Sequence, residues 1–165
     1  RVNRVTGRLV LETGGPRGVS GEPGRRVFTA AIPVRWSDQD LYHHVNHARM
    51  ITLIEEARIP WLFEEGTPTV TLAAGAVMTD LAVRYRGQIK YADGPIRIRM
   101  WCEKVGGAMF VARHEVRGRT TPDSAPPAVD CTATIAAFDL ATQRPRRFTR
   151  AERDHLLGYR HEDPT

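Results

Sequence analysis

Two aspartates and three histidines lie close together in one polar segment of the sequence. Asp38 and Asp40 are two positions apart, and His43, His44 and His47 follow shortly after them. A carboxylate in such a segment can attack a thioester carbonyl, or it can activate a water molecule that does so. The same residue types also occur at turns and helix caps beside solvated histidines. What the segment does therefore depends on the elements that position it.

A helix is predicted directly after this segment. Asn46 is a favourable N-cap residue, and Gly66 followed by Pro68 predicts where the helix stops. Apolar residues recur at spacings of three and four, which gives the helix one apolar face: Met50, Leu53, Ile54, Ala57 and Trp61. The first turn of a helix presents unpaired N–H groups and a partial positive charge. It can therefore hold a developing oxyanion close to the two aspartates.

The rest of the sequence predicts mostly β-strands. Residues 27–36 are rich in β-branched and aromatic residues and predict a strand, with Pro33 indicating an edge or a bulge. Further strands are expected at residues 77–86, 96–103, 108–117 and 129–140. A single amphipathic helix packed on a curved antiparallel sheet is the simplest way to bury both apolar faces. The fold class expected from the sequence is therefore α+β.

Turn-forming residues and one capping pattern divide the chain into three parts. Residues 1–25 combine a short apolar run with many Gly and Pro residues, so we expect a flexible segment with either an edge strand or disorder at that run. Residues 26–148 are expected to form the folded domain. Residues 149–165 are expected to hold a short helix and a tail, because Thr149 and Glu152 fit a capping box.

The composition favours one globular domain. The 165 residues are 41% hydrophobic and 26% charged, and no run of about 18 apolar residues predicts a membrane-spanning helix. The first residues lack the apolar stretch of a signal peptide, and two cysteines are too few for a disulfide framework. We therefore expect a cytoplasmic protein with reduced thiols. The net charge of +5 suits a partner that carries phosphates, but charge alone does not identify it.

The order of residues in the polar segment resembles one branch of the hotdog superfamily. The chain reads Arg35-Trp36-Ser37-Asp38-Gln39-Asp40-Leu41-Tyr42-His43-His44-Val45-Asn46 and, within the helix, Glu55-Glu56-Ala57-Arg58. The 4-hydroxybenzoyl-CoA thioesterase-like branch shows an aromatic residue after an arginine, then Asp-x-Asp, then His-Val-Asn leading into a helix with Glu-x-Ala-Arg. The resemblance extends over about residues 27–140, including the strand order. It implies a hotdog fold, in which an antiparallel sheet wraps around one long central helix.

The resemblance also implies an activity and the residues that perform it. Such family members hydrolyse acyl-CoA thioesters to a free acid and coenzyme A, with the coenzyme as part of the substrate and no separate cofactor. Asp40 matches the family's catalytic carboxylate, acting as nucleophile or general base. The backbone N–H near His47 matches the donor that polarises the thioester carbonyl, and Asn46 matches the cap that fixes this turn.

One position departs from the family pattern. Many members have glycine where this chain has His43. If the position needs a positive φ, a histidine there costs roughly 1 kcal/mol; otherwise the loop takes another path. His43 is therefore kept as a further candidate for contact with the substrate or for proton transfer.

Two other roles for residues in this region are less favoured. A metal site that uses His43 and His47 is disfavoured, because the first lies in a loop and the second in a helix, and no cysteine joins them. No metal is expected. Glu55 and Glu56 are candidates for the base, but Asp40 already fills that role. They are expected to be a solvated pair, with Glu55 linked to Arg58.

Basic side chains on the predicted strands are candidates for binding phosphate. The strand at residues 77–86 alternates between an apolar and a basic face: Leu81, Val83 and Tyr85 against Arg84 and Arg86. Together with Lys90, the two arginines could grip the phosphates of coenzyme A. A solvated sheet face is the alternative. Nucleic acid is not expected as a partner, because aromatic residues make up only 7% of the chain.

Three classes of function remain open. The first is a thioesterase acting on acyl-CoA or on an acyl carrier protein. The second is a hotdog dehydratase or hydratase, whose different local motif is not found. The third is a non-catalytic protein that binds acyl-CoA or an acyl carrier protein.

The expected assembly follows from the sheet. A lone hotdog subunit leaves a long sheet edge unpaired, and dimerisation covers it. The resemblance implies an active site between two subunits, with coenzyme A along the groove of the dimer. We therefore expect a homodimer, and the sequence leaves open a dimer of dimers, that is, a homotetramer.

Overall fold

The computed structural model describes residues 18–20 and 26–161 of the chain. The strands and helices follow in the order β1 (Gly18–Ser20), β2 (Val27–Ile32), α1 (His47–Leu62), β3 (Ala76–Tyr85), β4 (Ile96–Val105), β5 (Met109–Arg117), β6 (Val129–Asp139), β7 (Arg144–Pro145) and α2 (Arg150–Leu157). Short 3-10 turns occupy η1 (Trp36–Asp38), η2 (Val70–Ala74) and η3 (Tyr91–Asp93). The edge strand or disorder expected at the apolar run 9–11, and the tail at 162–165, lie outside the described residues.

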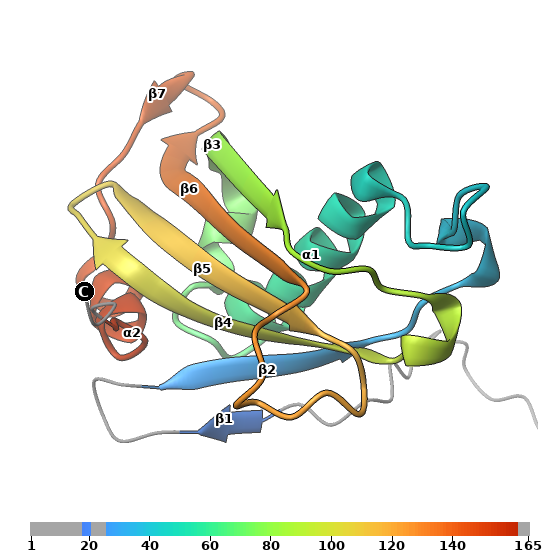
Figure 1. The fold of residues 1–165 in the computed structure, drawn as a ribbon. Helices are drawn as coiled ribbons and strands as arrows, with labels where there is room; N and C mark the ends of the chain where they lie inside the picture. The colour runs from blue at the N-terminus through green and yellow to red at the C-terminus, as the bar shows by residue number, and fades with distance from the viewer. Residues whose placement is uncertain (1–17, 21–25, 162–165) are drawn as a thin grey trace, which may run out of the picture.

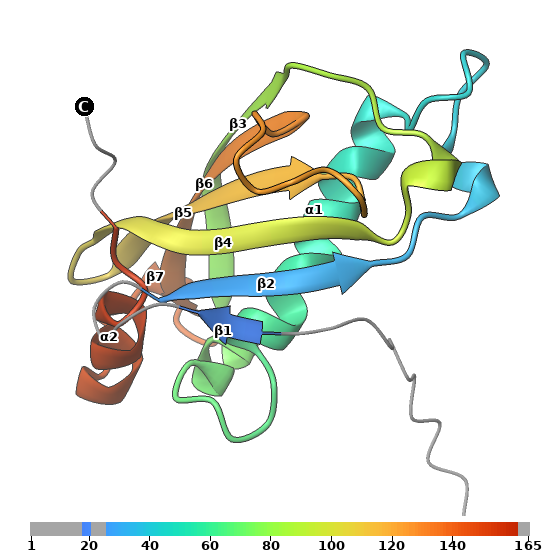
Figure 2. The same ribbon diagram turned by 60° about the horizontal axis from the view of Figure 1, so that its bottom comes forward.

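The strands form one antiparallel sheet, and α1 crosses one of its faces. The strand order is β1-β2-β4-β5-β6-β3, and β7 pairs with β6. Figure 1 and Figure 2 show the curvature of the sheet around the single long helix. The predicted α+β class and the order of strand, helix and further strands are confirmed.

The predicted apolar face of α1 forms the centre of the core. Its residues are no more than 1% exposed: Met50, Leu53, Ile54, Ala57 and Trp61. The Trp61 ring meets Phe110 of β5 and Tyr159, beyond α2, edge to face, with ring centroids 6.4 Å and 5.5 Å apart. Since Tyr159 follows α2, the C-terminal helix shares the core of the sheet and α1.

The structure corrects the sequence prediction at the ends of β2 and α1 and in the N-terminal segment. β2 ends at Ile32 rather than at residue 36, because Pro33 has no N–H to continue the ladder. Trp36 instead lies in η1 and is exposed. α1 ends at Leu62, before the predicted stop at Gly66. At the N-terminal side, Gly18–Ser20 pairs with β2 within the segment that was expected to be flexible.

A buried carboxylate joins α2 to the rest of the domain. The Glu152 side chain is fully buried. It accepts a hydrogen bond from Thr71 of η2 at 2.6 Å, and two from the terminal nitrogens of Arg146 at 2.7 Å and 2.9 Å. It also closes the predicted capping box with Thr149. Burial alone would raise the pKa of Glu152, but the hydrogen bonds from Arg146, Thr71 and Thr149 outweigh burial and lower it to about 2.

Glu152 makes the free energy of unfolding depend on pH in the acidic range. A lowered folded-state pKa contributes stability that is present above the ordinary glutamate pKa and is lost as the pH falls towards 2. We expect Glu152→Gln to lower the free energy of unfolding at pH 7 by about 2 to 3 kcal/mol, and the deficit to shrink at pH 3. Urea unfolding at both pH values, with the exposed Asp154→Asn as control, measures this. A deficit that is the same at both pH values would contradict the assignment.

Candidate active site

Asp38 is a structural residue of the loop before α1. It is 3% exposed, and its Oδ2 accepts the backbone N–H of Arg35 at 2.7 Å. Its own carbonyl accepts the backbone N–H of Asn46 at 2.8 Å. The first aspartate of the pair therefore closes the loop onto the start of the helix, and its carboxylate is turned inward.

Asp40 is the half-buried carboxylate of the same loop. Its Oδ1 accepts backbone N–H groups from Tyr42 at 2.9 Å and from His44 at 3.4 Å. Its backbone N–H donates to the carbonyl of His44 at 2.9 Å, which closes a tight turn. In the described part of the chain nothing donates to Oδ2. One carboxylate oxygen is thus fixed by the turn, and the other remains available for chemistry.

The turn places His43 in the left-handed region. Its φ is +58°, and its side chain is exposed. The position therefore does require the positive φ that the sequence raised as one of two possibilities, and the histidine adopts it at a cost of roughly 1 kcal/mol. The amide of His43 donates to the carbonyl of Asp40 at 3.0 Å, so the strained residue belongs to the turn that holds the carboxylate.

The first turn of α1 offers open amide groups. Asn46 is the N-cap, as predicted, and its Oδ1 accepts the N–H of Ala48 at 2.9 Å. Among residues 18–20 and 26–161, no group accepts the N–H of His47 or of Arg49. These two donors point along the positive end of the helix dipole. They are suited to an oxyanion that forms next to the helix start.

Tyr85 is a residue of this region that the sequence did not identify as part of the site. Its hydroxyl donates to the carbonyl of His47 at 2.8 Å and so ties the last residue of β3 to the first residue of α1. Burial, followed by the nearby Cys131, raises the pKa of Tyr85, which keeps the hydroxyl protonated as a donor. The strand alternation placed Tyr85 on the helix-facing side, but a contact across 38 positions has no signal in a single sequence.

The two glutamates of α1 both reach solvent, as expected, but Glu55 is not linked to Arg58. Glu56 accepts from Arg35 at 3.2 Å and thereby links the helix to the loop of Asp38. Glu55 is exposed, but Arg58 is 6% exposed and makes no ion pair with it. The expected link between Glu55 and Arg58 is therefore wrong, because α1 turns Arg58 towards the sheet.

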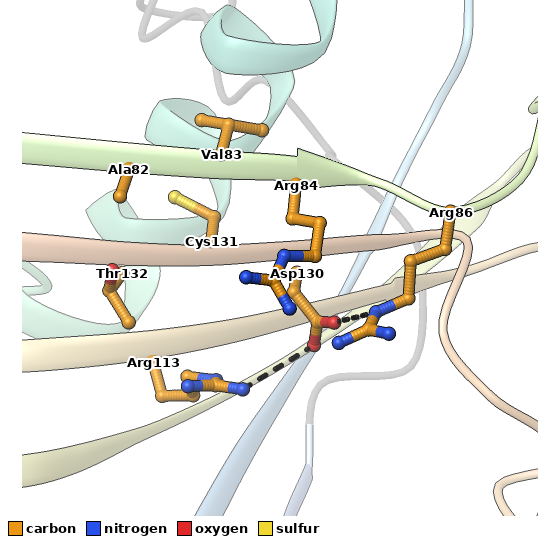
Figure 3. A pocket seen from close by; sticks show the side chains of 8 residues that line it. All are labelled: Ala82, Val83, Arg84, Arg86, Arg113, Asp130, Cys131 and Thr132. Atoms are coloured by element: carbon orange, nitrogen blue, oxygen red, sulfur yellow. Dashed lines mark hydrogen bonds and ion pairs between the residues drawn. The ribbon is translucent and has the colours of Figure 1, made fainter.

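The structure brings Arg84 and Arg86 together on the outer face of the sheet. They line a hollow of about 250 Å³ with Arg113 and Thr132, around the carboxylate of Asp130. Figure 3 shows the guanidinium groups of Arg86 and Arg113 directed at that carboxylate. Three cations surround Asp130 here, and Arg113 also pairs with Glu103 at 3.8 Å. Three positive charges against two carboxylates leave a positive surplus. Lys90 does not line this hollow; it caps the start of η3.

Neither a metal-binding cluster nor a membrane-spanning helix is found among the described residues. The described residues contain no group of three or more His, Cys, Asp or Glu side chains arranged to hold a metal ion. Within the same residues, no helix has both the length and the apolar character to cross a membrane.

Solved structures with the same fold come from several bacteria. A predicted thioesterase from Bacillus stearothermophilus has a TM-score of 0.69 and 18% identity, covering 82% of this chain and 98% of that one. A thioesterase from Thermus thermophilus, solved with coenzyme A and Zn, has a TM-score of 0.66 and 21% identity, covering 81% and 95%. A DHNA-CoA thioesterase from Staphylococcus aureus has a TM-score of 0.61 and 21% identity, covering 73% and 80%. At these identities the likeness shows the fold.

The sequence itself matches a family model. No curated protein matches the chain. The model of the thioesterase-like superfamily, however, matches residues 34–155, a span that begins before the loop of Asp40 and ends within α2. Because this match covers well over half of the sequence, the chain belongs to the thioesterase-like superfamily and has its hotdog fold.

Proposed function

We propose that the protein hydrolyses acyl-CoA thioesters, with Asp40 as its catalytic carboxylate. The superfamily supports thioester hydrolysis as the reaction class. The observation that carries the assignment to residues is the loop before α1, where two amides fix one oxygen of Asp40. Among the described residues, nothing donates to its other oxygen, and nothing accepts the N–H of His47 or Arg49 at the helix start.

The reaction uses these groups in order. The thioester carbonyl oxygen faces the N–H groups of His47 and Arg49, and Oδ2 of Asp40 lies against the carbonyl carbon. Asp40 either attacks that carbon, or takes a proton from a water molecule that attacks it. The amides stabilise the resulting oxyanion. Collapse of this intermediate breaks the carbon–sulfur bond and releases coenzyme A as a thiolate. In the nucleophilic route, water then hydrolyses the mixed anhydride and restores Asp40.

The positive charge of the arginine-lined hollow supports coenzyme A as the thiol that carries the acyl group. The hollow lined by Arg84, Arg86 and Arg113 holds more positive than negative charge, and guanidinium groups bind phosphates well. It lies on the opposite face of β3 from Tyr85, which contacts the helix start. One substrate can therefore reach both places by passing around the end of this edge strand. The related Thermus enzyme was solved with coenzyme A.

A homodimer formed at the edge of β3 completes the proposal. β3 is an edge strand of ten residues, whereas the other edge ends in the three-residue β1. Met78 and Tyr85 of β3 are 42% and 45% exposed. A long edge with exposed apolar side chains favours pairing with a second copy.

A cytoplasmic location is also proposed. Cys102 and Cys131 are both buried and free. Burial raises the pKa of each thiol, so both stay protonated and unreactive. Unpaired thiols suit a reducing compartment.

The catalytic role of Asp40 is tested by removing its charge alone. Asp40→Asn retains an oxygen that can accept from Tyr42 and His44, so the turn is preserved. We expect kcat to fall by a factor of about 100 or more on a panel of acyl-CoA substrates, while Asp154→Asn stays at the wild-type rate. Thiol release is the measurement. Unchanged hydrolysis would remove Asp40 from the mechanism, and a wild-type protein that hydrolyses no thioester would favour a non-catalytic binder.

The arginine hollow is tested by comparing two carriers of one acyl group. No described residue forms an ion pair with Arg84, so Arg84→Ala breaks no ion pair of the described fold. We expect it to raise KM for the acyl-CoA about tenfold, as loss of a charged hydrogen bond does, and to leave KM for the acyl-pantetheine unchanged. Arg150→Ala, on α2, is the control. Equal effects on both carriers would show that the hollow does not bind the nucleotide.

The dimer is tested by sedimentation equilibrium at assay concentrations. We expect a mass of twice 18.5 kDa, or a multiple of that mass if dimers pair further. A species of one chain that is fully active would contradict the proposed assembly.

A further inference from the structure

Arg58 is a buried cation that the proposed mechanism does not use. It lies on α1 and is 6% exposed, and its Nη1 is inaccessible to solvent. None of the described residues forms a hydrogen bond or ion pair with it. Glu55, the nearest acidic neighbour on the helix, is exposed. A guanidinium without a counter-ion in such a place destabilises the free protein.

The surroundings of Arg58 are polar but not acidic. His114 of β5 is completely buried, and its Nδ1 lies 3.3 Å from the carbonyl of Cys131. Since a carbonyl only accepts, Nδ1 carries the proton, and Nε2 has no partner. Burial, and then the charge of Arg58, lowers the pKa of His114 to about 3, so the imidazole is neutral. Thus neither His114 nor Cys131 supplies the missing negative charge.

Partly buried side chains of β3 lie between the start of α1 and the region of Arg58. Tyr85 contacts the carbonyl of His47. Further along the helix-facing side of β3, Val83 and Leu81 are only partly buried. Val83 pairs with Cys131 of β6, and Cys131 pairs with His114 of β5, so these residues form a row across the sheet. The charge of Arg58 acts on both Cys131 and His114, so Arg58 lies near this row. From Tyr85 to this row and beyond it, β3 presents the partly buried apolar side chains of Val83 and Leu81.

The geometry of α1 gives the distance between its first amides and the guanidinium of Arg58. Arg58 is eleven residues beyond His47, which is about 16 Å along the axis at about 1.5 Å per residue. An arginine on a helix leans back by about one turn, so its guanidinium lies about 11 Å from the first amides. An extended chain advances about 1.2 Å per bond. After allowance for the guanidinium contact, an acyl chain of about six to eight carbons spans the distance.

We propose that Arg58 binds a carboxylate at the far end of the acyl chain, so that the substrates are thioesters of dicarboxylic acids of this length. The inference rests on the proposed function, because it assumes that the thioester lies at the start of α1. The carboxylate supplies the contacting counter-ion that no described residue provides. An acyl chain that ends in a methyl group leaves the buried charge unpaired, and the enzyme discriminates against it for that reason.

The test compares octanedioyl-CoA with octanoyl-CoA, which share chain length and carrier. We expect wild type to have a kcat/KM at least about tenfold higher for octanedioyl-CoA. Arg58→Met, which keeps the volume without the charge, is expected to bring the ratio to about one, whereas Arg150→Met keeps the wild-type ratio. Arg58→Met is also expected to melt no lower than wild type, since it removes an unpaired charge.

The outcomes separate this inference from the proposed function. Equal use of both esters by wild type, or a preference for octanoyl-CoA, overturns the role of Arg58 but leaves thioester hydrolysis intact. If Arg58→Met melts lower and dissociates into single chains, Arg58 serves the contact between protomers, and the inference is again overturned. If wild type hydrolyses neither ester, the proposed function fails; calorimetric titration with the two esters then decides whether the terminal carboxylate is bound.

Discussion

The amides of Tyr42 and His44 hold one oxygen of Asp40, and the rest of the site depends on this contact. The contact sets the direction of the carboxylate in a turn that leads straight into the cap of α1. Asp38 closes the other side of the loop through its carbonyl bond to Asn46. Because the same few residues fix the carboxylate and begin the helix, the free oxygen of Asp40 and the amide donors belong to one hydrogen-bonded turn. Catalysis by preorganised groups requires such fixed geometry.

The edge strand β3 presents different side chains on the two faces of the sheet. Its helix-facing side ends at Tyr85, which secures the first residue of α1. Its outer side carries Arg84, and Arg86 follows directly after the strand; both line the hollow around the carboxylate of Asp130. Because side chains alternate along a strand, the neighbours Tyr85 and Arg84 lie on opposite faces of the sheet. Tyr85 lies beside the proposed reaction centre, and Arg84 belongs to the basic surface. The core under α1 keeps this strand in register, and Arg58, buried between helix and sheet, is the one charged residue of α1 that the core encloses.

The sequence allowed the α+β class, the apolar face of α1 and the caps Asn46 and Thr149 to be predicted, because these follow from local periodicity and capping chemistry. The end of β2 was misplaced, since the effect of Pro33 competes with the strand preference of its neighbours. The contact of Tyr85 with the helix start and the burial of Arg58 were missed for a different reason. Both come from contacts between α1 and distant strands, and helix spacing alone suggested a solvated place for Arg58.

The central claim is that a thioester carbonyl lies between the carboxylate of Asp40 and the open amides of α1. A crystal structure of Asp40→Asn with a bound acyl-CoA tests it most directly, because the substrate survives in that variant. The account predicts the carbonyl oxygen within about 3 Å of the N–H of His47 or Arg49, with the side chain at position 40 against the carbonyl carbon. A thioester bound elsewhere, with its carbonyl remote from the start of α1, would contradict the account.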